Sequence, residues 1–395
     1  MIKRILSLLL TLSMLLSLGA ILSSCGGDTT SGGPKDTSDS ASDVPTDSDS
    51  DTEDSSEASE SESASESESE SDSESESESE SESEEIYLEP DPIVEFITLN
   101  VAYYEGNSTN ITQVYEGQKI SDYTVEKRAA RLFPFVEYYM PDVLALQEVN
   151  RLWWPYIISN EDSIINKYGY DWAGNQGGLK SKNGKSSMDD DLYNLLLWDP
   201  DKFEEIDSGV FRLDSTFYGN ANKDRQCTWA ILKNKTTGVE TLFASTHLCT
   251  RGNDALKILN EKEAVALTRK IKEKADGRPI IMGGDFNAGA NSTSCTYITD
   301  DAKFFNARSV AKTNLTPGMA TYRSWGQTTN WKSSNNAIDH IFFFGNSHIA
   351  EEYKVLYDTF DGNNVISQDI SKVGTYYDLS DHLGVYTRFK ERDSK

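Results

Sequence analysis

Polar side chains of a few types stand beside short apolar segments of this chain, and their types suit hydrolysis at phosphorus. They are Asn100, Glu148, His247, Asp285, Asn287, Asp339, Asp381 and His382. Carboxylate and amide oxygens are hard ligands, which suit Mg²⁺ or Mn²⁺. Histidines with aspartates, beside a hard cation, can activate water and stabilise a pentacoordinate phosphorus. These residue types therefore indicate metal-assisted attack by water on a phosphate ester.

Other hydrolytic chemistries lack their sequence patterns here. The chain has no Cys/His cluster with zinc spacing, no Gly-x-Ser-x-Gly elbow and no phosphate-binding Gly-rich loop before a helix. Each polar residue alone has a structural explanation: Asp285 as a turn former, Asn287 as a helix cap, His247 as a buried core histidine. Their joint occurrence at the ends of predicted strands favours one functional site.

Alternating strands and helices must position these side chains. Period-two and buried apolar patterns predict strands over 93–99, 143–146, 194–198, 203–213, 228–233, 241–246, 279–282, 338–344, 349–357 and 383–389. Helical spacing predicts helices over 124–140, which Pro134 must kink or interrupt, and over 253–275. If the sheets are layered in register, the polar strand ends converge on one edge and form a cleft.

The segment around Asp285 shows how a strand end could present such groups. In Asp285-Phe286-Asn287 the period of two places the acid and the amide on one face and turns Phe286 to the core. Gly283-Gly284, just before it, permits a close approach of backbones.

Six short blocks occur in order along the chain. They are Thr98-Leu99-Asn100-Val101, Leu146-Gln147-Glu148-Val149, Ser245-Thr246-His247-Leu248, Gly283-Gly284-Asp285-Phe286-Asn287-Ala288, Ile338-Asp339-His340-Ile341-Phe342 and Ser380-Asp381-His382-Leu383-Gly384-Val385. Over residues 93 to 390 they resemble the endonuclease/exonuclease/phosphatase superfamily, whose fold deoxyribonucleases and neutral sphingomyelinases share. The resemblance implies an α/β (α+β) fold, a four-layer αββα sandwich, and metal-dependent phosphoester hydrolysis.

The resemblance also implies a role for each site residue. Glu148 would be the principal ligand of Mg²⁺ or Mn²⁺, with Asn100 and Asp381 near the same or a second ion. Asp285 would orient or deprotonate the attacking water, and Asn287 would hold a phosphate oxygen.

The remaining roles implied by the resemblance concern the histidines. His382, oriented by Asp339, would contact the phosphate or act as the base, and His247 would face the phosphate from the other side. The choice of base between Asp285 and His382 stays open. Asp191 is a loose candidate for an acid that orients the first histidine. His340 is expected to belong to its strand, and His348 to the surface.

Two segments could select the substrate. Residues 174–191 carry Lys180, Lys182 and Lys185, which suit a polyphosphate or nucleic-acid backbone, and residues 322–336 carry Trp325 and Trp331, which suit stacking or lipid. Both could equally be solvated loops. We expect extracellular nucleic acid or a nucleotide as substrate, with phospholipid or sphingomyelin as the alternative. A non-catalytic surface binding module is disfavoured because every motif position is filled.

The start of the chain indicates export. Lys3-Arg4 precedes an apolar run over 5–22, and Leu22-Ser23-Ser24-Cys25-Gly26 resembles the lipobox of bacterial lipoproteins. That resemblance implies cleavage before Cys25 and lipidation of its thiol; the alternative is an uncleaved membrane anchor. We therefore predict a signal peptide over 1–25 and an extracytoplasmic protein anchored by lipid to the bacterial membrane at the cell surface.

Composition divides the rest of the chain. Residues 26–90 hold 24 acidic residues and one base, with almost nothing apolar to bury, which predicts a disordered, extended stalk. Residues 91–395 are only mildly acidic and long enough for the catalytic domain. A strongly basic groove for nucleic acid is thereby disfavoured, although a local patch is not. Three cysteines lie outside the signal, Cys227, Cys249 and Cys295, and three thiols cannot all pair with one another. A disulfide between Cys227 and Cys249 remains one alternative.

Overall fold

The computed structural model describes residues 92–103, 123–174, 193–213, 225–323, 336–357, 359–361, 364–367 and 379–392. All of them belong to one compact unit, Ser83–Lys395. The predicted signal peptide and stalk lie outside the described residues. Among the helices that are described, none has the length and apolar character needed to cross a bilayer.

One mixed sheet has the strand order β10-β12-β15-β1-β2-β4-β3. Its strands are β1 (Ile93–Asn100), β2 (Val143–Val149), β3 (Asp171–Ala173), β4 (Tyr193–Trp198), β10 (Thr313–Asn314), β12 (His348–Leu356) and β15 (Gly384–Glu391). β1 runs parallel to β2 and antiparallel to β15, so that the end of β1, the end of β2 and the start of β15 meet at one edge.

The second sheet has the order β5-β6-β7-β8-β11-β9. Its strands are β5 (Phe203–Arg212), β6 (Gln226–Asn234), β7 (Glu240–His247), β8 (Ile280–Asp285), β9 (Phe305–Asn306) and β11 (Asp339–Phe344), and β13 (Thr359–Asp361) pairs separately with β14 (Asn364–Ser367). β7 and β8 are parallel and β11 is antiparallel to β8, which brings two strand ends and one strand start together.

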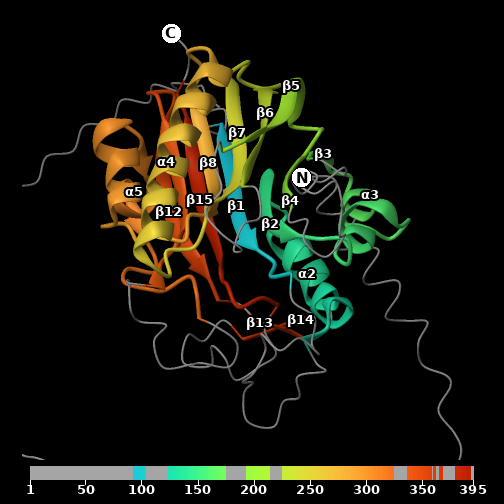
Figure 1. Ribbon diagram of the computed structural model, residues 1–395. Coiled ribbons are helices and arrows are strands. Elements are labelled where there is room, and N and C mark those ends of the chain that lie inside the picture. The colour runs from blue at the N-terminus through green and yellow to red at the C-terminus, as the bar shows by residue number, and fades with distance from the viewer. Residues whose placement is uncertain are drawn as a thin grey trace, which may run out of the picture. The chain divides into compact units, whose positions relative to one another are not determined.

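Helices cover the outer face of each sheet. They are α2 (Val125–Tyr139), α3 (Ile164–Tyr168), α4 (Asp254–Ala275), α5 (Thr293–Thr296) and α6 (Ala307–Val310), with π-helical turns over Pro155–Ser159 and Tyr297–Asp301. Figure 1 shows α2 and α3 on one flank and α4 and α5 on the other. The order helix, sheet, sheet, helix is the four-layer sandwich that the sequence predicted, and that prediction is confirmed.

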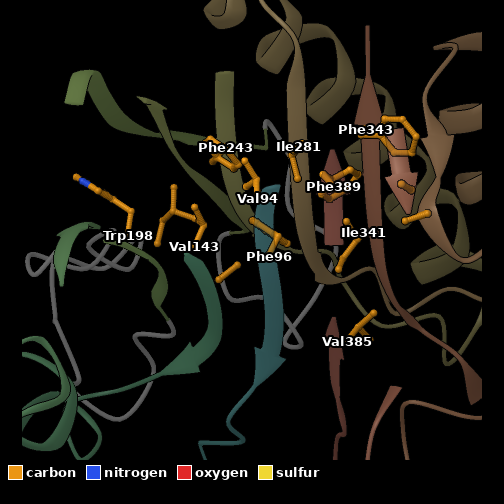
Figure 2. Packing of buried hydrophobic residues seen from close by; sticks show 14 of the residues in the cluster. Val94, Phe96, Val143, Trp198, Phe243, Ile281, Ile341, Phe343, Val385 and Phe389 are labelled. Carbon is orange, nitrogen blue, oxygen red and sulfur yellow. The ribbon is translucent and has the colours of Figure 1, made fainter. Parts of the chain in front are cut away.

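The inner faces of the two sheets form the central core. Strand alternation puts Val94 and Phe96 of one sheet against Phe243 and Ile281 of the other, and all four side chains are fully buried. Figure 2 shows these side chains in the layer between the sheets. The Phe96 and Phe243 rings stack with their centroids 6.3 Å apart. The same alternation, continued along each strand, determines which polar side chains point inward at its end.

Two further apolar clusters lie outside the sheets. Leu132 and Val136 of α2 pack on Ile97 and Leu144, while on the other flank Leu267 and Ile271 of α4 pack on the second sheet. The helices begin at side-chain caps: Thr124 Oγ1 accepts from Lys127 N, and Asn253 Oδ1 accepts from Leu256 N.

Helix α2 is not interrupted at Pro134, which was one of the two outcomes that the sequence predicted there. Pro134 is buried inside the helix, and α2 runs on past the proline to Tyr139. A proline inside a helix costs about 3 kcal/mol because it removes one backbone hydrogen bond and adds a clash. Burial of Leu132, Phe135 and Val136 on the sheet offsets that cost.

A buried polar network joins the two sheets beneath their common edge. Gln147 Nε2 donates to Thr98 Oγ1 and to Ser245 Oγ, each at 3.0 Å. Ser245 Oγ in turn donates to Leu146 O at 3.1 Å. The three side chains come from β2, β1 and β7, so the network crosses from one sheet to the other.

Candidate active site

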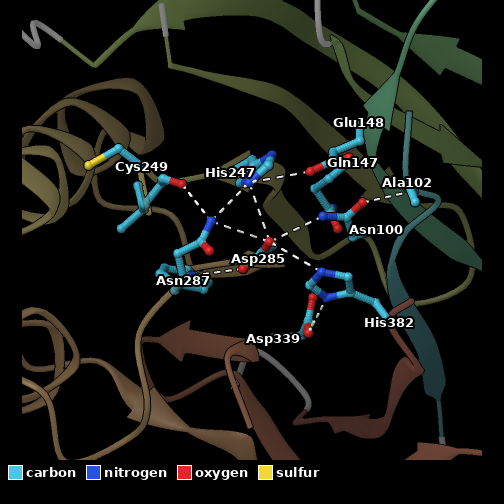
Figure 3. A network of polar contacts seen from close by, with 12 residues as sticks. Asn100, Ala102, Gln147, Glu148, His247, Cys249, Asp285, Asn287, Asp339 and His382 are labelled. Carbon is cyan, nitrogen blue, oxygen red and sulfur yellow. Dashed lines mark hydrogen bonds and ion pairs between the residues drawn. The ribbon is translucent and has the colours of Figure 1, made fainter. Parts of the chain in front are cut away.

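Four of the predicted site residues, Asn100, His247, Asp285 and Asp339, lie on the inward-facing side at the ends of strands from both sheets. On β7 and β8 the register pairs His247 with Asp285, and on β11 and β8 it pairs Asp339 with Asp285. Asn100 ends β1 on the same inward face as Phe96. Figure 3 shows their side chains gathered around Asp285. The predicted convergence on one edge is therefore present in the structure.

Asp285 is at the centre of the cluster, and its side chain is 2% exposed. Its Oδ2 accepts a hydrogen bond from Asn100 Nδ2 at 3.1 Å and lies 3.3 Å from His247 Nε2 and 3.7 Å from His382 Nε2. Its Oδ1 accepts from Asn287 N at 2.7 Å. One carboxylate thus contacts groups from both sheets, with an imidazole on either side.

His382 and Asp339 form a hydrogen-bonded pair. His382 Nδ1 lies 2.8 Å from Asp339 Oδ2, which leaves Nε2 directed toward Asp285. Both residues are buried. The ring of Tyr322 packs on the imidazole with ring centroids 4.9 Å apart, and the backbones of Tyr322 and His382 form an isolated antiparallel β-bridge. The imidazole is therefore held on two sides.

His247, Asn287 and Glu148 form the other flank of the cluster. Asn287 Nδ2 lies 3.0 Å from His247 Nε2 and donates to Leu248 O at 2.9 Å. His247 Nε2 is 3.9 Å from Glu148 Oε1. Asn287 has a φ of 50°, in the left-handed region that asparagine tolerates better than most residues.

Glu148 reaches the site through an irregular strand end. Alternation along β2 puts Gln147, not Glu148, on the inward face, where Gln147 joins the buried network. The pairing of β2 with β4 shifts register between Leu146 and Val149, and Glu148 has a φ of 59°. Its Oε2 accepts from Tyr103 N at 3.0 Å. This bulge redirects the carboxylate toward His247, as bulges near functional sites commonly do.

Burial changes the acidity of the site residues. It raises the pKa of Asp285 to about 7, against the lowering effect of His382. It also raises the pKa of Asp381 to about 6, and the Glu148 carboxylate adds to that rise. Burial lowers the pKa of His382, but the carboxylates of Asp339 and Asp285 outweigh it and hold the pKa well above 6.5.

The side chains at this edge could hold a divalent cation. In the described part of the chain, two groups of three offer ligand atoms within 4.8 Å of one another: Glu148, His247 and Asp285, and Asp285, Asp339 and His382. Buried carboxylates crowded in this way repel one another unless a positive charge lies between them.

The predicted metal ligands are not equally placed. Glu148 belongs to the first of these groups, whereas Asp381 is in neither group of the described residues. Asn100 Oδ1 accepts from Ala102 N at 2.9 Å, and Ser380 Oγ donates to Asn100 O at 2.6 Å. These bonds link the end of β1 to the segment that carries Asp381.

The other histidines differ from the site histidines. His340 is fully buried in β11, with Nε2 2.8 Å from Ala288 O and Nδ1 3.3 Å from Asn306 Nδ2. The expectation that His348 lies at the surface is wrong: it is 4% exposed, with Nε2 3.5 Å from Glu391 Oε1. Inward alternation along β12 explains its burial, because His348 is on the same face as Ala350.

The remaining predictions divide between the described and undescribed parts of the chain. Cys227, Cys249 and Cys295 are all buried and free, so the Cys227–Cys249 bridge does not form in this structure. Burial raises the pKa of Cys249 to about 12, which makes it a poor nucleophile. Asp191, the lysines of 174–191, the tryptophans of 322–336 and Cys25 lie outside the described residues.

Thr321 supports the site and was missed by sequence reasoning. Its Oγ1 accepts from Ile338 N and from Asp339 N, each at 3.0 Å, and its carbonyl accepts from Leu383 N at 2.7 Å. It therefore ties the Asp339 end of β11 to the segment of His382. Ala320-Thr321-Tyr322 carries no period or motif that could have revealed this role.

A four-layer sandwich with carboxylates, histidines and asparagines at one strand edge defines a class of metal-assisted phosphoester hydrolases. The family model described as Endonuclease/Exonuclease/phosphatase family matches residues 97–382. The chain belongs to this family. A search of curated proteins found no match.

Solved structures show the same fold. An endonuclease/exonuclease/phosphatase from Bacteroides vulgatus is 22% identical, covers 76% of this chain and all of its own, and has a TM-score of 0.56. A mannosyl-6-phosphatase from Bacteroides thetaiotaomicron is 20% identical over 75% of this chain and 99% of its own, with a TM-score of 0.54. The human Nocturnin catalytic domain with a bound sulfate anion is 16% identical over 77% and 97%, with a TM-score of 0.53.

Proposed function

We propose that this protein hydrolyses a phosphate ester by direct attack of water with the help of Mg²⁺ or Mn²⁺. The observation that carries the proposal is the position of Asp285, whose Oδ2 lies within 3.7 Å of both His247 Nε2 and His382 Nε2. A carboxylate between two imidazoles can orient a water and place proton carriers on either side of a phosphate.

The cation would be held mainly by Glu148, with Asn100 and Asp381 as the neighbouring oxygen ligands. When bound, it would supply positive charge to the phosphate oxygens in the transition state. Glu148 suits this role because the bulge of β2 turns its Oε1 to 3.9 Å from His247 Nε2. The buried carboxylates around it supply the negative charge that a divalent ion neutralises.

The chain's own residues would handle the water and the phosphate. Asp285 orients or deprotonates the water, while Asn287 and His247 face one side of the phosphate and His382 the other. Asp339 keeps His382 Nδ1 occupied through the 2.8 Å contact, so that only Nε2 faces the substrate. No covalent intermediate is required, because neither a serine elbow nor a thiolate is part of the cluster.

For the substrate we propose a phosphodiester of extracellular nucleic acid or a nucleotide. Among the described residues, the large exposed apolar side chains are Tyr138, Ile206, Ile258, Val265, Phe305, Val310 and Leu315, and none of these belongs to the strand ends around Asp285. The polar side chains at these described strand ends favour a polar substrate over phospholipid or sphingomyelin. We further propose that Cys25 anchors the protein to the membrane by lipid, with residues 91–395 outside the cytoplasm.

A substrate panel tests the activity. Residues 86–395 would be incubated with plasmid DNA, a dinucleotide, sphingomyelin, a hexose 6-phosphate and a chromogenic phosphodiester, with chelator or with added Mg²⁺ or Mn²⁺. We expect hydrolysis that the chelator abolishes and either metal restores. Turnover in ¹⁸O water should place one labelled oxygen in the phosphate product. No hydrolysis of any ester with either metal would overturn the proposal, and a trapped phosphorylated side chain would overturn direct attack.

A pair of variants assigns the metal requirement to Glu148. Glu148→Gln should raise the Mg²⁺ concentration needed for half-maximal activity by about 10- to 100-fold. Glu240→Gln is the control, since Glu240 starts β7 at the opposite edge, where it accepts from Arg278 Nε at 2.8 Å. Equal metal dependence in the two variants would contradict the role of Glu148.

A further inference from the structure

One buried amide on α4 contacts both loops that carry the phosphate-facing residues. Asn260 is fully buried, and its Nδ2 donates to Cys249 O at 2.6 Å and to Phe286 O at 2.9 Å. Cys249 is two residues after His247, and Phe286 lies between Asp285 and Asn287. Both amide hydrogens are therefore used to hold two backbone carbonyls in fixed positions.

The orientation of Asn260 is itself fixed. Its Oδ1 accepts from Ser294 Oγ and, at 3.4 Å, from Arg251 Nη1. Because the oxygen and the nitrogen have separate partners, the amide cannot rotate without losing bonds at both ends.

On the other flank, Arg128 of α2 has a similar arrangement. It is fully buried, and its Nη1 donates to Val101 O at 2.5 Å, to Ala102 O at 2.9 Å and to Leu379 O at 3.5 Å. Val101 follows Asn100, and Leu379 is two residues before Asp381. The guanidinium thus ties together the two loops that carry the predicted metal ligands Asn100 and Asp381.

The backbone at this point needs such a partner. Ala102 has a φ of 55°, so the chain has turned out of the strand and its carbonyl is not bonded within the ladder. Trp153 Nε1 also donates to Ala102 O at 2.9 Å, and the Arg128 guanidinium lies over the Trp153 ring at 5.0 Å. A planar group with several fixed donors fits this position, whereas a lysine ammonium has a different geometry.

We propose that Arg128 and Asn260 are positioning residues, each aligning one half of the site from the helix that covers its sheet. Arg128 aligns the half that binds the divalent cation, and Asn260 aligns the half that binds the phosphate. This inference rests on the proposed function, which assigns the two halves their ligands. It predicts that the two helices control two separable binding events.

Thermal unfolding separates cation binding from phosphate binding without turnover. The full-length chain is titrated first with Mn²⁺ alone and then with inorganic phosphate at fixed Mg²⁺. A ligand that binds only the folded state stabilises it by RT ln(1 + [L]/Kd), so a fit of melting temperature against ligand concentration gives a dissociation constant, which we call the midpoint of that titration. Changes around metal ligands commonly alter affinity by about 10- to 100-fold. Arg128→Lys should move the Mn²⁺ midpoint upward by about that factor. Asn260→Ala should move the phosphate midpoint upward while its Mn²⁺ midpoint stays within about twofold of the wild type.

Matched controls and second variants complete the test. Asn234→Ala and Arg278→Lys alter a buried asparagine and a part-buried arginine at the opposite edge, where Asn234 bonds Glu391 and Arg278 bonds Glu240. Both should leave both midpoints unchanged. If Arg128→Lys does not fold, Trp153→Phe removes one donor to Ala102 O and should still raise the Mn²⁺ midpoint.

The remaining outcomes separate failure of the inference from failure of the proposed function. If Asn260→Ala does not fold, Ser294→Ala removes one of the two donors to Asn260 Oδ1 and should raise only the phosphate midpoint. A wild-type chain that responds to neither ligand would contradict the proposed function. If the wild-type chain responds to both ligands but the variants move both midpoints together, or move neither, the inference is overturned.

Discussion

Replacing Asp339 with asparagine should lower the rate of the chemical step without removing the general acid–base group. The Asp339 carboxylate is buried and lies 2.8 Å from His382 Nδ1. The asparagine side chain would keep the shape of the carboxylate but lose its charge. A hydrogen bond that involves a charged group is worth about 1.5–3 kcal/mol, which corresponds to about 10- to 150-fold in rate. Removing the imidazole in His382→Ala should cost more, on the order of 10²–10⁴.

A double-mutant cycle tests whether Asp339 acts through His382 alone. If it does, Asp339→Asn should lower the single-turnover rate by less than about threefold once His382 is already alanine. The assay uses saturating Mg²⁺ and the ester that the substrate panel identifies. Asp301→Asn, an exposed acid in the turn after α5, is the control and should leave the rate unchanged. Rate losses that simply multiply would refute the reasoning, because Asp339 would then contribute independently of the imidazole.

Three further predictions concern stability and the stalk. Burial lowers the pKa of His340 to about 4, so between pH 6.5 and pH 4 the unfolded state binds a proton that the folded state does not bind. About 3 kcal/mol of stability, fully present above pH 6.5, should therefore be lost as the pH falls toward 4. In urea titrations, the free energy of unfolding of His340→Gln should depend less on pH than that of the wild type, and an unchanged dependence would count against this reasoning. A Cβ on Gly284 would lie 2.0 Å from Thr246 O, so Gly284→Ala should destabilise the folded state by about 3 kcal/mol or more. Gly252 has open space around its Cβ position, so Gly252→Ala should change stability by less than about 0.5 kcal/mol. Equal melting temperatures of the two variants would contradict this prediction. Removing residues 1–85 should leave kcat on a soluble ester unchanged, since every site residue follows Ile93, and a large drop would show that the stalk takes part in catalysis.

Strand alternation made most of the candidate site predictable. Every second residue of β1, β7 and β8 points into the core between the sheets. The same alternation, continued to the ends of these strands, makes Asn100, His247 and Asp285 point inward as well. The helix of residues 254–275 was equally clear because its apolar positions repeat at helical spacing. In these segments local pattern and tertiary packing agree, so the sequence alone was sufficient.

Other features depend on contacts between distant segments and had no local signal. Glu148 faces the site only because β2 bulges against β4, a property of the pairing rather than of either strand. Asn260 and Arg128 occupy buried positions on helices where their polarity would suggest exposure. Each is stabilised by carbonyls far away in sequence, such as Phe286 O and Leu379 O, which no periodicity reveals.

The network of Thr98, Gln147 and Ser245 has a consequence for how the enzyme can open. Because Gln147 bonds partners on both sheets just below the site, relative sliding of the sheets would break buried hydrogen bonds that have no water to replace them. The strand ends that the two sheets contribute to the site should therefore move as one rigid frame. Amide hydrogen exchange at Gln147 and Ser245 should proceed only through global unfolding, while faster exchange there would indicate breathing between the sheets.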